Sequence, residues 1–154
     1  MIALYKGTSS MSRLIRWATW SQYSHAAWIN DQSGQCIQAW RAGVVSSRSF
    51  SEGHKPGTAV DFFSVRGEGS DESSAIESVL NLELGKSYDV AGILGFVIRR
   101  DRQNQDRWFC SELVFHAYEC VGLHLLSRVP PCKVFPGMLA ISPLLKHEYS
   151  MTTI

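Results

Sequence analysis

The sequence predicts an α+β fold in which an antiparallel sheet packs against helices. Several short strand-like runs follow one another between residues 24 and 65, with turn-forming residues between them. Helical spacing of apolar residues precedes these runs and returns after residue 69. The chain has 154 residues, of which 45% are hydrophobic and 19% charged, the composition of a globular domain. We therefore expect residues 1–154 to form one domain with helices on one side of the sheet.

The N-terminal segment is expected to form a short strand at Ile2–Tyr5 and then a helix at about Ser10–Thr19. A serine at position 9 or 10 can cap this helix. Four apolar residues follow helical spacing on one side: Met11, Leu14, Ile15 and Ala18. Arg13 and Arg16 lie on the other side.

The next segment predicts a β-hairpin. Ser24–Asn30 and Gln35–Arg41 are strand-like, and the turn residues Asp31–Gly34 separate them. A four-residue turn pairs Asn30 with Gln35. Further strands are expected at Gly43–Phe50 and Thr58–Val65.

Helices dominate the rest of the prediction. One begins at Ser70 or Asp71 and is ended by Gly85. The others are a buried helix at Tyr88–Ile98, a third helix at Trp108–Val121 ended by Gly122, and a brief one near Pro136–Ala140, with a surface loop at Arg99–Arg107.

Charge and hydropathy exclude several classes of function. Fifteen Lys and Arg against fourteen Asp and Glu give a net charge of +1, so no nucleic-acid partner is expected. The longest apolar run, Val90–Ile98, is far shorter than the roughly 20 residues of a membrane span. The start, MIALYKGTSS, lacks the pattern of a signal peptide. This predicts a cytoplasmic location, with delivery to a cell wall by lysis or injection as the alternative.

The four cysteines predict free thiols. They lie at positions 36, 110, 120 and 132 with no CxxC pair. His116 and Cys120 are one helical turn apart, but zinc would need two further ligands. We therefore expect no metal and no cofactor.

Cys110 and His25 are the residues best suited to chemistry. Cys110 lies near the start of the third helix, where unpaired N–H groups favour a thiolate and lower its pKa. Its own N–H could donate to an oxyanion. His25 begins a strand and could serve as the base. The alternatives are a buried core cysteine and a hydrogen-bonded histidine at a strand edge.

Other residues could complete this site. In the predicted register Ala27 lies opposite Gln38, so Gln38 is diagonal to His25 and its oxygen could accept from the imidazole. Tyr88 could donate to an oxyanion, or could be an ordinary tyrosine at the edge of the core. Ser24 and Ser111, next to His25 and Cys110, are further candidates for contact with substrate or oxyanion. The remaining histidines, at positions 54, 124 and 147, show no partner.

A basic and aromatic group lies in and just after the first helix: Arg13, Arg16, Trp17 and Trp20. One interpretation is contact with an anionic polymer or with membrane head groups. The other is a solvated helix face whose tryptophans anchor the core.

The ordered motifs resemble those of a known family. YSHAAWI, CIQAW, GKSYDVAGILGF and WFCSELVFHAYECVGL together resemble the circularly permuted papain-like amidases. These are relatives of the NlpC-type cell-wall endopeptidases and of the lecithin:retinol acyltransferase group. The opening LYKGTSSMSRLIRWATWSQYSH is also similar, so the resemblance spans about residues 3–122. In that family the histidine strand precedes the cysteine helix, the reverse of papain.

The resemblance implies a permuted papain-like (NlpC-type) fold with Cys110 as nucleophile, His25 as base and Tyr88 bordering the site. The family usually has a carboxylate where this sequence has Gln38, which leaves the third catalytic role open. The implied activity is an amidase or endopeptidase acting on peptidoglycan peptides or related amide bonds. The expected partner is thus a peptide or acyl substrate, cell-wall fragments included.

Two other activities stay open. One is a lipid acyl hydrolase or acyltransferase with the same dyad, and the other is a binding or interaction module without catalysis. Burial of Cys110, or a His25 side chain that points away from it, would favour the module.

Overall fold

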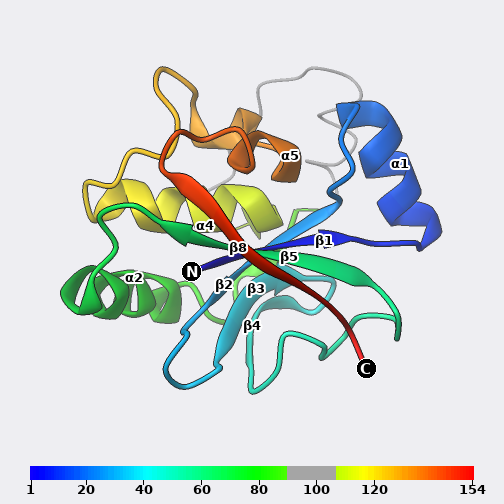
Figure 1. Cartoon of the computed structure of the whole chain (residues 1–154), viewed down its shortest axis with the longest axis horizontal. Coiled ribbons are helices and arrows are strands. Elements are labelled where there is room, and N and C mark those ends of the chain that lie inside the picture. The colour runs from blue at the N-terminus through cyan, green and yellow to red at the C-terminus, as the bar shows by residue number, and fades with distance from the viewer. Residues whose placement is uncertain (90–106) are drawn as a thin grey trace.

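The structure is a computed structural model, and it describes residues 1–89 and 107–154. Its centre is a six-stranded antiparallel sheet with the strand order β4-β3-β2-β1-β5-β8 (Figure 1). The strands are β1 (Ile2–Lys6), β2 (His25–Ile29), β3 (Cys36–Trp40), β4 (Gly43–Ser47), β5 (Ala59–Val65) and β8 (Leu145–Thr152).

The helices and two short strands complete the described structure. The helices are α1 (Ser10–Thr19), α2 (Ser70–Leu82), α4 (Cys110–Cys120) and α5 (Pro136–Leu139), with a 3-10 turn, η1, at Pro131–Lys133. The strands β6 (Ser87–Tyr88) and β7 (Arg107–Trp108) pair in parallel. None of the helices in the described ranges is long and apolar enough to cross a membrane.

The two faces of the sheet are covered differently. On one face, α2 and α4 pack on Leu4, Ala26 and Trp28 in the main core. On the other face, the loop between β4 and β5 contributes Phe50 to a smaller cluster that contains Tyr5 and other strand residues. Successive strand residues alternate between these faces. Tyr5 and His25 are paired across β1 and β2, and each lies next to a residue that packs under α4. Both side chains therefore lie on the face opposite α4.

The α+β architecture of the prediction is confirmed. Helix α1 has the expected bounds, and the Ser9 hydroxyl caps it by accepting from the N–H of Ser12. The hairpin register is also confirmed, because the N–H of Asn30 donates to the carbonyl of Gln35 at 2.9 Å.

Three expectations around the second half of the chain need correction. Tyr88 does not begin a helix but lies in β6, and from residue 90 the expected helix at Tyr88–Ile98 falls outside the described residues. Of the expected loop, residues 99–106 also fall outside, and Arg107 belongs to β7. The third helix begins at Cys110 and not at Trp108, which pairs with Tyr88 in the short sheet.

Strand β8 was not predicted, since the tail was expected to contain only a brief helix. The helix is present as α5, but Leu145–Thr152 then forms the edge of the sheet beside β5. Most of this strand is exposed, so its sequence, LKHEYSMT, lacks a strongly apolar side. A β-bulge between Phe62 and Phe63 further shifts the register of its partner.

The outer face of α1 also differs from the expectation. Trp17 and Trp20 are exposed and do not anchor the core. Met11 and Leu14 are exposed as well, and among the four spaced apolar residues only Ile15 is buried.

The start of β4 requires glycine. Gly43 has φ +104°, and a Cβ there would lie 2.5 Å from the backbone oxygen of Lys86. We expect Gly43→Ala to lower the free energy of unfolding by about 3 kcal/mol, from backbone strain and this clash. Gly34, at φ +73° in open space, is the matched control, and Gly34→Ala should cost about 1 kcal/mol. Urea denaturation measures both, and equal losses would contradict the clash.

Candidate active site

Strands β2 and β3 separate at one end, and the candidate site is built around this opening. Their ladder contains only Trp28↔Ile37 and Ile29↔Cys36, although β3 continues to pair with β4 as far as Trp40. The N–H of Asn30 donates to the carbonyl of Gln35 and so points toward the β3 side. Because every second N–H of a strand points to the same side, the Ala26 N–H also points toward β3. Because the ladder has ended there, this N–H is available to another acceptor.

His25 and Gln38 meet across the opening. The Nε2 of His25 lies 2.6 Å from Oε1 of Gln38, and both side chains are buried. The Gln38 amide is oriented by its own Nε2, which donates to the carbonyl of Glu52 at 3.5 Å. An amide oxygen only accepts, so His25 carries its proton on Nε2 and keeps a lone pair on Nδ1. The predicted contact between these two side chains is therefore confirmed.

Burial makes the neutral imidazole the resting form of His25. Burial lowers the pKa of His25 well below its usual value, and the neighbouring His54 lowers it further. The hydrogen bond that His25 donates to Gln38 raises the pKa of His25 and partly offsets these effects. A neutral ring with a free Nδ1 is the form that a general base requires.

His54 is a member of this cluster that the sequence did not reveal. Its Nε2 lies 3.1 Å from the same Gln38 oxygen, and its ring stacks on Tyr5 with centroids 4.1 Å apart. The Trp40 ring lies 4.8 Å away, and burial lowers the pKa of His54 to about 4. His54 comes from the loop between β4 and β5, whose path over the sheet has no local sequence signal. The expectation that it has no partner was wrong.

Cys110 is the first residue of α4 and is fully buried. Burial raises the pKa of its thiol to about 12, and the backbone N–H groups of Ala26, Ser111 and Cys110 partly oppose this. The N–H groups at the start of the helix therefore lower the pKa of the thiol as expected, but burial raises this pKa by more. The resting thiol is neutral.

Cys110 and His25 are linked through neighbouring residues of β2. Ala26, whose N–H faces the Cys110 sulfur, directly follows His25 in β2. Within residues 1–89 and 107–154, however, the structure shows no hydrogen bond between this sulfur and the His25 ring. Proton transfer between them therefore needs the His25 side chain, whose ring packs with those of Tyr5 and His54, to turn toward the thiol.

Tyr88 lies beside the thiol, as expected for a residue bordering the site. It packs on a small cluster formed by Ile15, Phe109 and Cys110. Burial, and then the nearby Cys110 and Asp89, raise the pKa of Tyr88, so its hydroxyl stays protonated and able to donate.

The two serine candidates have structural partners. The Ser111 hydroxyl donates to the carbonyl of Val134 at 2.6 Å, and both this hydroxyl and the Ser111 N–H act on the Cys110 thiol and lower its pKa. The Ser24 hydroxyl accepts from Gly7 N–H at 3.0 Å and donates to the Tyr5 carbonyl at 3.3 Å. The Ser24 hydroxyl thus has a structural role, whereas the Ser111 hydroxyl also lies close to the thiol.

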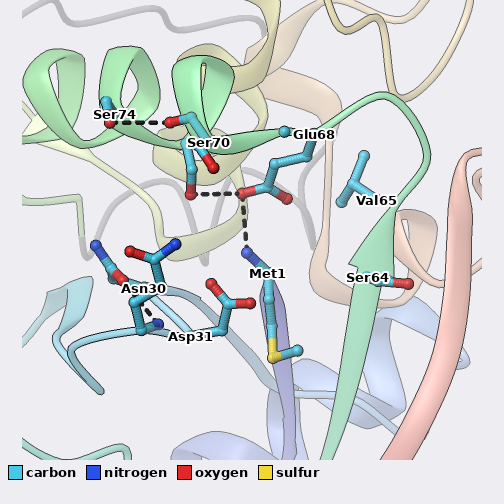
Figure 2. A pocket seen from close by; sticks show the side chains of 11 residues that line it. Met1, Asn30, Asp31, Ser64, Val65, Glu68, Ser70 and Ser74 are labelled. Atoms are coloured by element: carbon cyan, nitrogen blue, oxygen red, sulfur yellow. Dashed lines mark hydrogen bonds and ion pairs between the residues drawn. The ribbon is translucent and has the colours of Figure 1, made fainter.

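A separate pocket of about 280 Å³ lies at the other end of β1 (Figure 2). Figure 2 shows Met1, whose amine donates to Glu68 at 2.9 Å, with the start of α2 above it. At a rise of about 3.3 Å per residue, Met1 and Tyr5 are about 13 Å apart along the strand. This pocket is therefore distinct from the site at His25. No cluster of three or more potential metal ligands occurs in the described part of the chain.

Comparisons with known proteins give a likeness in fold. No family model and no curated protein match the chain. Among solved structures, it is similar to the crystal structure of metalloprotein yiiX from Escherichia coli O157:H7, described as DUF1105. The two are 19% identical, with a TM-score of 0.72 over 97% of this chain and 95% of that chain. At this identity the likeness concerns the fold alone.

The buried histidine cluster should make stability depend on pH. In the unfolded chain His54 takes up a proton below about pH 6.5, whereas in the folded protein it does so only near its pKa of about 4. The free energy of unfolding should therefore fall as pH drops through this interval. We expect His54→Gln to reduce that fall.

Urea denaturation at several pH values between 7 and 4 measures the effect. His124→Gln, which removes an exposed histidine, serves as the control. A His54→Gln profile parallel to that of the wild type would contradict the buried, neutral state of His54.

Proposed function

We propose that this protein is a cysteine-dependent amidase or endopeptidase with a permuted papain-like fold, formed by residues 1–154 as one domain. Cys110 is the nucleophile and His25 is the base. The observation that carries the proposal is the opening between β2 and β3. There the first residue of a helix directs a thiol at the N–H of Ala26, the residue that follows a histidine oriented by Gln38. The motif resemblance supports the same assignment.

The chemical step starts from a neutral thiol. Nδ1 of His25 takes the proton from Cys110 as the sulfur attacks the carbonyl carbon of the substrate. The oxyanion that forms accepts from the Cys110 N–H and from the Tyr88 hydroxyl. The intermediate then collapses to a thioester, and the imidazolium of His25 gives its proton to the leaving amine. Water attacks the thioester with His25 again as base, which releases the acid and restores the thiol.

Gln38 holds the base in the tautomer that this step requires. Its oxygen binds Nε2–H of His25 and so leaves Nδ1 for the thiol. An amide has no charge to stabilise an imidazolium, in contrast to a carboxylate. The mechanism therefore depends on a short-lived charge on His25 and does not need a resting ion pair.

The substrate assignment rests on the motif resemblance. Amide bonds in peptidoglycan peptides, or related amides, are the proposed targets. A lipid acyl hydrolase or acyltransferase would use the same dyad. Incubation with peptidoglycan fragments and, separately, with phospholipid, followed by mass spectrometry, distinguishes the two. Cys110→Ser is the control in both arms, because a hydroxyl is a far weaker nucleophile at this site.

A binding module without catalysis is the second candidate. It is favoured by the complete burial of Cys110 and by the raised pKa of its thiol, at about 12. In such a module the thiol would be a core residue, and His25 would have no influence on its reactivity.

The reactivity of Cys110 separates the two candidates. If His25 acts as base, His25→Ala should slow the reaction of Cys110 with iodoacetamide at pH 7 by about tenfold or more. Peptide mapping by mass spectrometry follows each thiol, and the exposed Cys120 is an internal reference whose rate should not change.

Equal Cys110 rates in the wild type and His25→Ala would overturn the catalytic proposal and support the module. His147→Ala, an exposed histidine far along the chain in β8, is the matched control.

A further inference from the structure

Helix α1 presents an apolar stripe to solvent. Met11, Leu14 and Trp17 follow one another at intervals of three residues and are 41%, 37% and 70% exposed. Trp20, directly after the helix, is 94% exposed. A single exposed apolar side chain is ordinary, but residues three apart on a helix are neighbours, so Met11, Leu14 and Trp17 form one surface at the end of which Trp20 follows.

Another side of α1 fixes the helix to the protein. Ser12 and Ile15 are buried, and Ile15 packs against Phe109 and Cys110. The helix is therefore oriented with its larger apolar side chains outward. Among residues 1–89 and 107–154, no packing covers Met11, Leu14 or the two tryptophans, so in this part of the chain they form an uncovered apolar surface.

The backbone at Trp20 supports this interpretation. Trp20 ends the helix in the left-handed conformation, with φ 51° and ψ 34°. This conformation favours glycine and costs other residues roughly 1–2 kcal/mol. The indole ring is almost fully exposed, so packing within the protein does not offset this cost.

Positive charge accompanies the stripe. Arg13 is exposed and lies one turn before Trp17, and Arg16 occupies the last turn, where it also donates to the Gly7 carbonyl at 3.3 Å. The first acidic residue in the sequence is Asp31. Residues 1–30 thus contain basic and no acidic side chains, although the whole chain has a net charge of only +1.

We propose that this face of α1 docks on an anionic lipid bilayer. A helix with tryptophan and leucine on its outer face and arginine beside them matches the interfacial layer, where indole rings and guanidinium groups lie at the head groups. A second copy of the chain fits less well, because a symmetric contact would place the arginines of both copies in one interface.

Docking would place the candidate site close to the membrane surface. Ile15 lies on the inner side of α1 against Cys110, and a helix with its side chains is about 10 Å thick. The thiol would therefore lie about one helix diameter below the lipid head groups. The docking itself rests on the surface of α1 and not on the proposed hydrolase activity.

Co-sedimentation with vesicles tests the proposal. The full chain should bind vesicles of phosphatidylcholine with about one third phosphatidylglycerol more tightly than pure phosphatidylcholine, and added salt should weaken the binding. Arg13→Gln should lower the affinity about fivefold. Trp17→Ala should lower it by a similar factor or more.

Trp20→Gly is the sharpest variant, because its effects on folding and docking are opposite. Glycine relieves the left-handed backbone, so Tm should stay the same or rise, whereas vesicle binding should fall about fivefold or more. Leu82→Ala is the matched control, since Leu82 is 80% exposed at the end of α2, on the other side of the molecule from α1 in Figure 1. It should bind as the wild type does.

Three results would overturn the proposal. These are no preference for anionic vesicles, unchanged binding in all three α1 variants, or a dimer in light scattering that Trp17→Ala abolishes. The dimer would show that a second copy covers the stripe. Cys110→Ser should dock normally, so a failure of docking and a failure of the hydrolase proposal are distinguishable.

Discussion

The hydrogen bond between His25 and Gln38, across the opening between β2 and β3, is the interaction on which the candidate site depends. It joins two strands at the point where their backbone ladder has ended. It also decides which nitrogen of the imidazole carries the proton. A second donor, from His54, reaches the same oxygen, so a neutral amide binds two imidazole rings at once. Without this contact the base would have neither a fixed tautomer nor a fixed orientation.

Burial opposes the formation of the reactive thiolate in this site. A thiol at the start of a helix gains from three N–H groups, but the dry surroundings raise its pKa to about 12. The same dryness keeps His25 neutral. Both partners therefore rest uncharged, and the charge has to form during the reaction, where preorganised N–H groups stabilise it most. If the site is catalytic, its rate depends on how well an uncharged pair becomes charged next to substrate.

Local patterns predicted the parts of this site that are close in sequence. The turn at Asp31–Gly34 set the hairpin register, and the register placed Gln38 diagonal to His25. Features that depend on residues distant in the sequence were not predicted, because local patterns do not show which distant segments pack together. His54 reaches the cluster through a loop, and β8 is an exposed edge strand with little apolar signal. The pKa of Cys110 depends on burial by distant segments, which helix position alone does not show.

The protonation of the His25 ring tests the central claim most directly. Nitrogen-15 NMR of the imidazole distinguishes a proton on Nε2 from one on Nδ1. The account predicts a neutral ring protonated on Nε2 at pH 7, with an Nδ1 signal that changes in Cys110→Ser and an Nε2 signal that changes in Gln38→Leu. A ring protonated on Nδ1 would contradict this account. So would a ring whose signals change in neither variant.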